Sequence, residues 1–198
     1  MTTLHYRGTL SDPARRESLV LHLTACAASQ DWGAIPVDDA DAGLAGIILQ
    51  PANKLEPIPF LFDAGGRLHA LADLIAPGGV PILIVSVKTH YAGTDAHRAF
   101  CDLLRHIKDA YMPDLAVTDE SEYWDHGDET RLKAYFARLD RLAKNLCDHL
   151  THDVAPSPDN DPDNLIDCIT LAAEITHRQE NALMHDTIGG CDGEAKTE

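Results

Sequence analysis

The chain has 198 residues, 44% of them hydrophobic and 24% charged, a composition typical of globular proteins that excludes wholesale disorder. Acidic side chains outnumber basic ones by 32 to 16, which gives a formal net charge of −16, and most of this excess lies in residues 148–198. Nonspecific nucleic-acid binding and docking on anionic membranes both need a surplus of Lys and Arg. We therefore expect neither nucleic acid nor membrane as a partner.

The cysteines and the first residues indicate a cytoplasmic protein. No CxxC pair or zinc-finger spacing occurs, so a structural zinc site is not expected. No cofactor is expected either. The number of cysteines is odd, and their scattered positions fit a reducing compartment. They are Cys26, Cys101, Cys147, Cys168 and Cys191. The first residues lack the pattern of a signal peptide, and the longest apolar run, Val80–Val87, is too short to span a bilayer.

The first half of the chain predicts strands around one helix. The alternation in Leu4–Leu10 predicts a half-buried strand. Asp12 and Pro13 then form a typical helix start, and the helix should run to about Gln30. Further strands and a hairpin return are expected at Leu44–Leu49, Pro59–Phe62 and Arg67–His69, with a turn at Asp63–Gly66.

The second half predicts a central strand and longer helices. The unbroken apolar run Pro81–Val87 predicts a strand buried on both faces. A helix capped by Thr94 or Asp95 should follow, ending at Pro113 with an apolar stripe formed by Phe100, Leu103, Leu104, Ile107 and Tyr111. A short strand at Leu115–Val117 and a long helix from Gly127–Glu129 to about His149 complete this part.

These elements predict an α+β fold over residues 1–150, with a mixed β-sheet, helices on one face in a ferredoxin-like variant, and two C-terminal helices. A linker is expected at 151–163, a further helix at 164–186 and a disordered tail at 187–198. The apolar stripe on that further helix needs a surface to cover it. It packs on the domain, or it forms a homodimer contact through residues 165–184.

Part of the sequence resembles an uncharacterised family of bacterial proteins. The resemblance spans about residues 4–145 and implies a bacterial cytoplasmic origin, but it supplies no activity and no functional residue. It is carried by Phe62–Leu68, Lys88–Gly93, Tyr111–Leu115, Glu122–Trp124 and Gly127–Glu129.

A first candidate site is the stretch 88–97, which leads from the predicted central strand into a helix N-terminus. Free backbone N–H groups at such a position can bind an anion, and Lys88 adds positive charge. His90 and Tyr91 follow it, and His97 lies near the helix start. The plain alternative is a strand-to-helix turn with no ligand.

A second candidate site is the stretch 118–129, which combines several carboxylates, one imidazole and two large aromatic side chains. Such a loop can bind a metal ion, act in acid–base catalysis or anchor a partner protein. Several of its acids have structural uses, since Asp128 can cap the long helix. If the two stretches leave parallel strands, they converge on one sheet edge alongside Gly8–Thr9. The candidate binding residues of this stretch are Asp119, Glu122, Tyr123, Trp124 and His126.

We therefore expect a non-catalytic, acidic binding protein of the immunity or adaptor kind, with a basic protein as its partner. The alternative is a small metal-dependent hydrolase or transferase at the same loops, and a purely structural or oligomer-forming role is a third. The alternative enzyme would use His90, His97, Asp119, Glu122 and His126. It requires at least three of these groups close together in a concave site.

Overall fold

The structure is a computed structural model that describes residues 2–51 and 55–153, with side chains as far as Asn145. The chain divides into two compact units, Met1–Phe136 and Ala137–Glu198, which are described separately. The first unit holds the sheets and every site considered below. In the second, the described residues form one helix, α5, which starts in the first unit at Glu129 and runs to Asp153.

Seven strands and five α-helices make up the described part of the chain. The strands are β1 (Thr3–Arg7), β2 (Gly33–Asp39), β3 (Leu44–Gln50), β4 (Ile58–Phe62), β5 (Leu68–His69), β6 (Val85–Lys88) and β7 (Ala116–Asp119). The helices are α1 (Arg16–Ser29), α2 (Leu71–Ile75), α3 (Gly93–Ala110), α4 (Tyr123–His126) and α5 (Glu129–Asp153).

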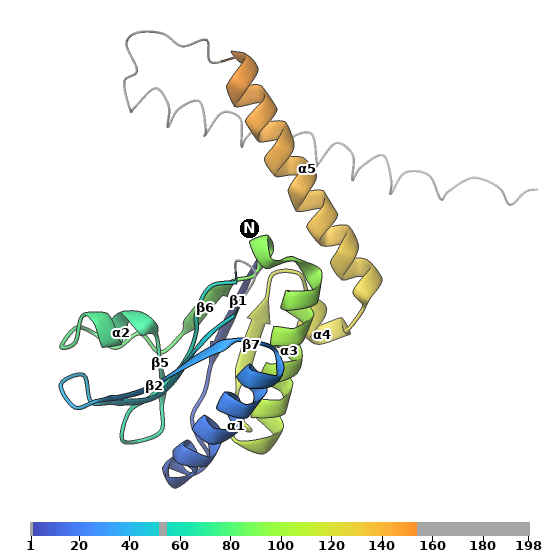
Figure 1. Ribbon diagram of the computed structural model, residues 1–198. Coiled ribbons are helices and arrows are strands. Elements are labelled where there is room, and N and C mark those ends of the chain that lie inside the picture. The colour runs from blue at the N-terminus through green and yellow to red at the C-terminus, as the bar shows by residue number, and fades with distance from the viewer. Residues whose placement is uncertain (1, 52–54, 154–198) are drawn as a thin grey trace, which may run out of the picture. The chain divides into compact units, whose positions relative to one another are not determined.

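The strands form two sheets, with the orders β6-β1-β7 and β2-β3-β4-β5. Every pair of neighbouring strands is antiparallel. Because β6 and β7 both oppose β1, they run in the same direction on either side of it, and α3 connects them. Figure 1 shows α1 and α3 next to each other on one side of the strands, with α2 on the other side.

The two sheets are joined where β1 ends. Thr9 forms an isolated antiparallel bridge with Arg67, and the N–H of Leu68 donates to the carbonyl of Gly8 at 3.0 Å. Further back on β1, the buried hydroxyl of Tyr6 donates to the carbonyl of Pro59 in β4 at 2.8 Å. Its ring also lies against Phe60, so the two sheets enclose one continuous apolar core.

One glycine allows β3 and β4 to approach closely. A Cβ atom placed on Gly46 would lie 2.0 Å from the carbonyl oxygen of Phe60, a distance that no side chain can adopt. Gly46 therefore permits the β3–β4 register, in which it opposes Leu61.

Several local predictions are confirmed. The carboxylate of Asp12 accepts the N–H of Ala14, and a 3₁₀ turn begins at Pro13 and leads into α1. The carboxylate of Asp128 accepts the N–H groups of Thr130 and Arg131 at the start of α5. The predicted stripe on α3 faces the core, with Phe100, Leu104 and Ile107 fully buried and Tyr111 nearly so, while Leu103 is half-buried.

The prediction of a central strand at Pro81–Val87 is wrong. Strand β6 begins only at Val85 and lies at an edge of its sheet, and residues 81–84 are exposed outside it. An apolar run is consistent with burial, but it does not specify which strands become neighbours. Here β1 pairs with β6 only as far as Val85, and beyond the end of β1 Thr9 forms an isolated bridge with Arg67, the residue before β5.

The α+β class is confirmed, although two antiparallel sheets stand in place of a mixed sheet. Strand β2 and the short helices α2 and α4 were not predicted. Pro36 occurs in β2, where it is tolerated because β2 is an edge strand. The predicted linker, C-terminal helix, tail and dimer contact fall outside the described residues, except that residues 151–153 continue α5. Among the described helices, none is both long enough and apolar enough to cross a membrane.

Candidate functional site

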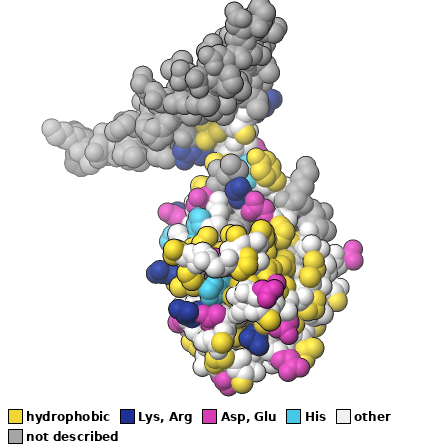
Figure 2. Space-filling view, turned by 90° about the vertical axis from the view of Figure 1, so that its left-hand side faces the viewer, with side chains coloured by type: hydrophobic (Ala, Val, Ile, Leu, Met, Phe, Trp, Pro, Cys, Tyr) yellow, Lys and Arg dark blue, Asp and Glu magenta, His cyan; other side chains and the backbone are white. Residues whose placement is uncertain are grey.

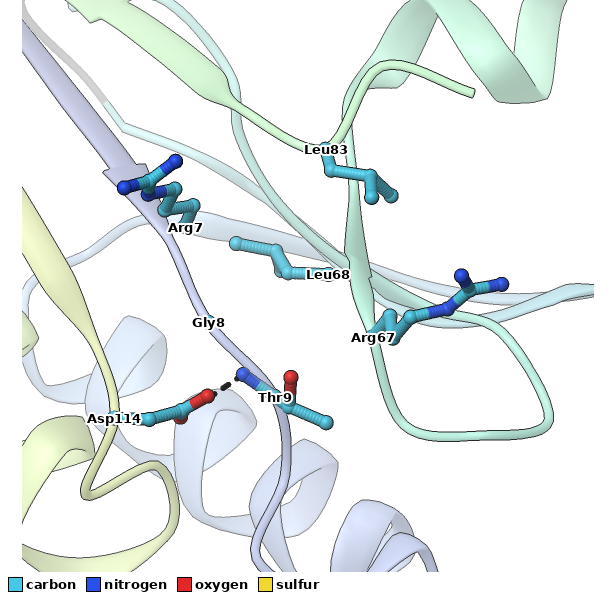
Figure 3. Close-up of a pocket in the computed structure, with 7 residues that line it drawn as sticks. All are labelled: Arg7, Gly8, Thr9, Arg67, Leu68, Leu83 and Asp114. Atoms are coloured by element: carbon cyan, nitrogen blue, oxygen red, sulfur yellow. Dashed lines mark hydrogen bonds between the residues drawn. The ribbon is translucent and has the colours of Figure 1, made fainter. Parts of the chain in front are cut away.

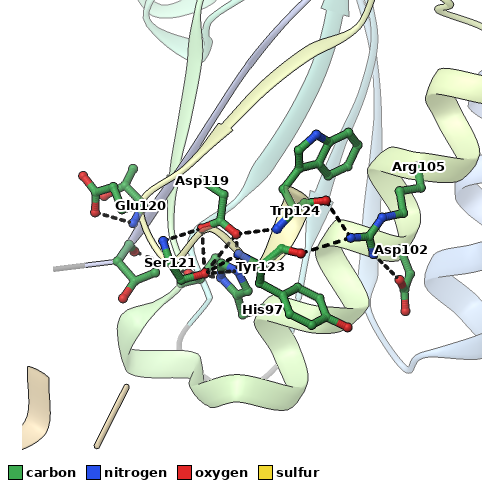
Figure 4. A network of polar contacts seen from close by, with 11 residues as sticks. His97, Asp102, Arg105, Asp119, Glu120, Ser121, Tyr123 and Trp124 are labelled. Carbon is green, nitrogen blue, oxygen red and sulfur yellow. Dashed lines mark hydrogen bonds and ion pairs between the residues drawn. The ribbon is translucent and has the colours of Figure 1, made fainter. Parts of the chain in front are cut away.

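The two candidate stretches meet where β6 and β7 end, at one end of the strands of the β6-β1-β7 sheet. Thr89 directly follows β6, and its Oγ1 lies 2.8 Å from Nδ1 of His97 in α3. On the other side of the ring, His97 Nε2 lies 3.1 Å from Oδ2 of Asp119, the last residue of β7 (Figure 4). The backbone N–H of Thr89 also donates to the carbonyl of Thr2, so the residue that precedes β1 joins the same group. We call Thr89, His97, Asp119 and Ser121 the polar cluster.

The carboxylate of Asp119 is surrounded by donors. It accepts the N–H of Ser121 at 2.9 Å, the N–H of Trp124 at 3.0 Å and the Ser121 hydroxyl at 2.8 Å. Burial alone would raise the pKa of Asp119, but the bond and charge of His97 and the two backbone N–H groups outweigh it and lower the pKa. Asp119 is therefore held as a carboxylate.

The polar cluster does not have the geometry of a catalytic triad. In a Ser–His–Asp triad, the nucleophile and the carboxylate contact opposite ring nitrogens. Here Ser121 Oγ and Asp119 Oδ2 both face Nε2 of His97. The side chains of His97 and Asp119 have no exposed area, so no substrate reaches them in this conformation. The arrangement can connect α3 to the ends of β6 and β7.

A buried cysteine lies against the polar cluster. Cys101 is one helical turn after His97, and one ligand atom each from His97, Cys101 and Asp119 lies within 4.8 Å of the others. Burial, with the charge of Asp119, raises the pKa of the Cys101 thiol to about 12. Without a cation beside it, the sulfur therefore keeps its proton.

The remaining candidates from the first stretch lie near the polar cluster without joining it. Lys88 is exposed and pairs with Glu56, its Nζ 3.5 Å from Oε1. The ring of His90 stacks on Phe136 with centroids 6.0 Å apart, and it meets Tyr91 edge-on. Tyr91 itself is 65% exposed.

Two candidates from the second stretch form a surface ion-pair group. Glu122 Oε2 lies 3.1 Å from a guanidinium nitrogen of Arg131 and 3.8 Å from Nε2 of His126. Glu122 has a left-handed backbone conformation, φ 60°, at the start of α4. All three side chains are more than half exposed, so these contacts contribute little to stability.

The two aromatic residues of the second stretch point toward α3. Tyr123 is buried, and Trp124 is half-buried. Arg105 in α3 lies over both rings, 5.4 Å from the centroid of Tyr123 and 5.2 Å from that of Trp124. It also donates to both backbone carbonyls, as Figure 4 shows. These aromatic side chains hold the loop on α3, so they are not exposed anchors for a partner protein.

The expectation that Gly8–Thr9 lies beside the two stretches is wrong, because β1 runs opposite to β6 and β7. Gly8–Thr9 lies at the opposite end of these strands, where a cavity of about 260 Å³ opens between the diverging sheets. Its lining is Arg7, Gly8, Thr9, Arg67, Leu68, Leu83 and Asp114. In Figure 3 the two guanidinium groups point away from each other, and Asp114 accepts the N–H of Thr9.

A larger cavity of about 460 Å³ lies between α1 and α3. The imidazoles of His22 and His106 stack there with centroids 4.5 Å apart and planes 13° from parallel. Burial and the neighbouring His106 lower the pKa of His22. Because nitrogen lone pairs lie in the ring plane, two stacked rings do not direct their donors at one metal ion.

The surface also shows an exposed apolar segment, residues 75–84, formed by the end of α2 and the chain that leads to β6. Val80 is 89% exposed and Ile75 75%. The other exposed aliphatic side chains are Ile82, Leu83 and Ile84. Figure 2 views the molecule from the side on which Figure 1 shows α2, and hydrophobic side chains gather across the middle of this face.

Sequence reasoning missed Thr89, Ser121, Cys101 and Arg105 as members of these groups. A spacing of four residues between His97 and Cys101 was the available signal, since it places both on one helix face. Comparison with known proteins finds no matching family model, curated protein or solved structure.

Proposed function

We propose that this chain is a non-catalytic protein-binding module, and that the apolar segment 75–84 is its contact surface. The observation that carries the proposal is the exposure of five large aliphatic side chains within ten residues. Monomeric soluble proteins rarely leave a large apolar patch facing water, and such patches are typical of interaction sites. A partner would remove this surface from water.

The position of the segment supports a contact with another protein. It leads directly into β6, an edge strand with one neighbour in its sheet. The exposed aliphatic side chains of this segment contribute little to the described core. Contact with a partner would bury them, which folding of the chain does not do.

The polar cluster supports a role without catalysis. The alternative enzyme needs His97 and Asp119 to reach a substrate, and both side chains are fully enclosed by the protein. Their hydrogen-bonding groups already contact Thr89, Ser121 and the backbone of Trp124. Glu122 and His126 lie in a surface ion-pair group with Arg131.

We further propose that the partner is a protein with a basic surface around an apolar centre. The formal charge of −16 would attract such a partner over several ångströms and speed association at low salt. The site of action would be a bacterial cytoplasm. The free thiols of Cys26 and Cys101 fit a reducing compartment.

The test compares three tagged full-length proteins against extract from the native host: the wild type, the double variant Ile75→Asp and Val80→Asp, and the control Leu21→Asp. Leu21 is a matched control because it is 66% exposed and lies on α1. We expect one host protein to bind the wild type and Leu21→Asp, to be lost from the double variant, and to dissociate as salt rises. Equal recovery by all three proteins would contradict the proposal.

A further inference from the structure

The group formed by His97, Cys101 and Asp119 brings together three kinds of metal-ligating atom. His97 and Cys101 are four residues apart on α3 and therefore share one face of the helix. Asp119 ends β7 and faces them, and one donor atom from each residue lies within 4.8 Å of the other two. All three residues are buried.

The neighbours of these residues orient them as metal ligands are oriented in proteins. A ligating histidine usually uses its second ring nitrogen in a hydrogen bond, which fixes the ring. Thr89 Oγ1 contacts Nδ1 of His97, which leaves Nε2 facing Asp119. The backbone N–H groups of Ser121 and Trp124 hold the carboxylate in place.

The donor set and its spacing fit zinc. Mg²⁺ and Ca²⁺ prefer oxygen ligands alone, whereas Zn²⁺ binds nitrogen, sulfur and oxygen in tetrahedral sites. Zinc–ligand bonds of about 2.0–2.3 Å place tetrahedral ligands roughly 3.3–3.8 Å apart. The 3.1 Å between Nε2 and Oδ2 is close to this spacing, and the 4.8 Å limit needs a contraction of about 1 Å.

Charge balance supports the same ion. One Zn²⁺ with a thiolate, a carboxylate and a neutral imidazole has no net charge, which is the state least opposed by burial. On binding, Cys101 transfers its thiol proton to solvent and the sulfur coordinates as a thiolate. Ser121 Oγ, 3.1 Å from Nε2 and 2.8 Å from Oδ1 of Asp119, is the nearest further donor.

We propose that His97, Cys101 and Asp119, with Ser121 as the fourth donor, form a structural site for one Zn²⁺ ion. The ion fixes α3 to the end of β7 and therefore holds the two stretches 88–97 and 118–129 together. The site is independent of the proposed protein-binding surface, which lies on the segment 75–84.

The test uses Co²⁺ as a probe on the full-length protein after chelator treatment, because cobalt–thiolate bonds give a characteristic near-ultraviolet absorption. The wild type should bind one equivalent with this absorption. A variant that retains Cys101 and has alanine at the four other cysteines should do the same. Cys101→Ser should lose the absorption. Thr89→Val, which removes the bond to Nδ1, should weaken binding by about 10- to 100-fold.

Two control measurements distinguish loss of metal binding from loss of folding. Far-ultraviolet circular dichroism establishes that each variant is folded, and native mass spectrometry of the wild type counts bound Zn²⁺ without any substitution. One Zn²⁺ per wild-type chain is expected. No bound zinc in the wild type, or an undiminished cobalt–thiolate absorption in Cys101→Ser, would overturn the proposal.

Discussion

The Nε2 atom of His97 lies 3.1 Å from Oδ2 of Asp119, and neither side chain has any exposed area. This contact joins two residues that are 22 positions apart in the sequence, and it fixes α3 against the end of β7. Thr89 extends the connection to Thr2, the residue that precedes β1.

Replacing Asp119 with alanine should destabilise the fold. It leaves His97, the N–H of Ser121 and the N–H of Trp124 without their acceptor, and losing one partner of a buried pair costs about 3–5 kcal/mol. Urea unfolding measures the change. The control Asp125→Ala is exposed and should stay within about 0.5 kcal/mol of the wild type. Equal stability of the two variants would show that the polar cluster is not structural.

Tyr6→Phe should weaken the connection between the two sheets. The substitution retains the ring but removes the hydrogen bond that the Tyr6 hydroxyl donates, so the buried carbonyl of Pro59 loses a donor. An unsatisfied buried group costs about 1–3 kcal/mol of unfolding free energy. Tyr91→Phe is the matched control, because Tyr91 is 65% exposed. A Tyr6→Phe protein as stable as that control would contradict the assigned role.

Sequence patterns predicted the elements correctly where neighbouring residues determine the structure. Asp12 and Pro13 specify a helix start within three residues, and Asp128 does the same for α5. The α3 stripe follows helical periodicity, which needs no knowledge of the partner surface. The α+β class followed from these local elements.

Sequence patterns failed where the structure depends on pairing between residues that are distant in the sequence. The run Pro81–Val87 has the composition of a central strand, yet β1 pairs with β6 only as far as Val85, and residues 81–84 remain exposed. Pairing of α3 with the end of β7 was likewise invisible, so Ser121 and Cys101 could not be connected with His97. The convergence of the two stretches was predicted, and β6 and β7 do run in the same direction, but the antiparallel β1 places Gly8–Thr9 at the opposite end of these strands.

Gly46→Ala should be strongly unfavourable. The new methyl group would lie 2.0 Å from the carbonyl oxygen of Phe60, so β3 and β4 would have to separate. Overpacking of this kind costs about 1–3 kcal/mol or more. Gly79→Ala is the control, since its nearest neighbour would be 4.0 Å away. Thermal melts that coincide for both variants would show that the close approach of the strands does not constrain position 46.

Asp63 should make stability depend on pH in the acid range. Burial raises its pKa, but hydrogen bonds from Arg67 and His69 outweigh this effect and lower the pKa below the ordinary 3.8. A lowered folded-state pKa adds stability above 3.8, and this stability is lost as pH falls through the folded-state value. Asp63→Asn should therefore be less stable than wild type near neutrality, and the difference should shrink below 3.8. Urea midpoints across that range measure it, and a difference that grows on acidification would contradict the assignment.

The measurement that tests the protein-binding proposal most directly is photo-crosslinking in the native host, with a photoreactive amino acid at position 80 or position 21. Both native side chains are highly exposed, Val80 in the apolar segment and Leu21 on α1. We predict that position 80 gives one discrete protein adduct and that position 21 does not form it. The yield of this adduct should fall when crosslinking is repeated in host extract at higher ionic strength. The same adducts at both positions, or none at position 80, would contradict a partner surface at residues 75–84.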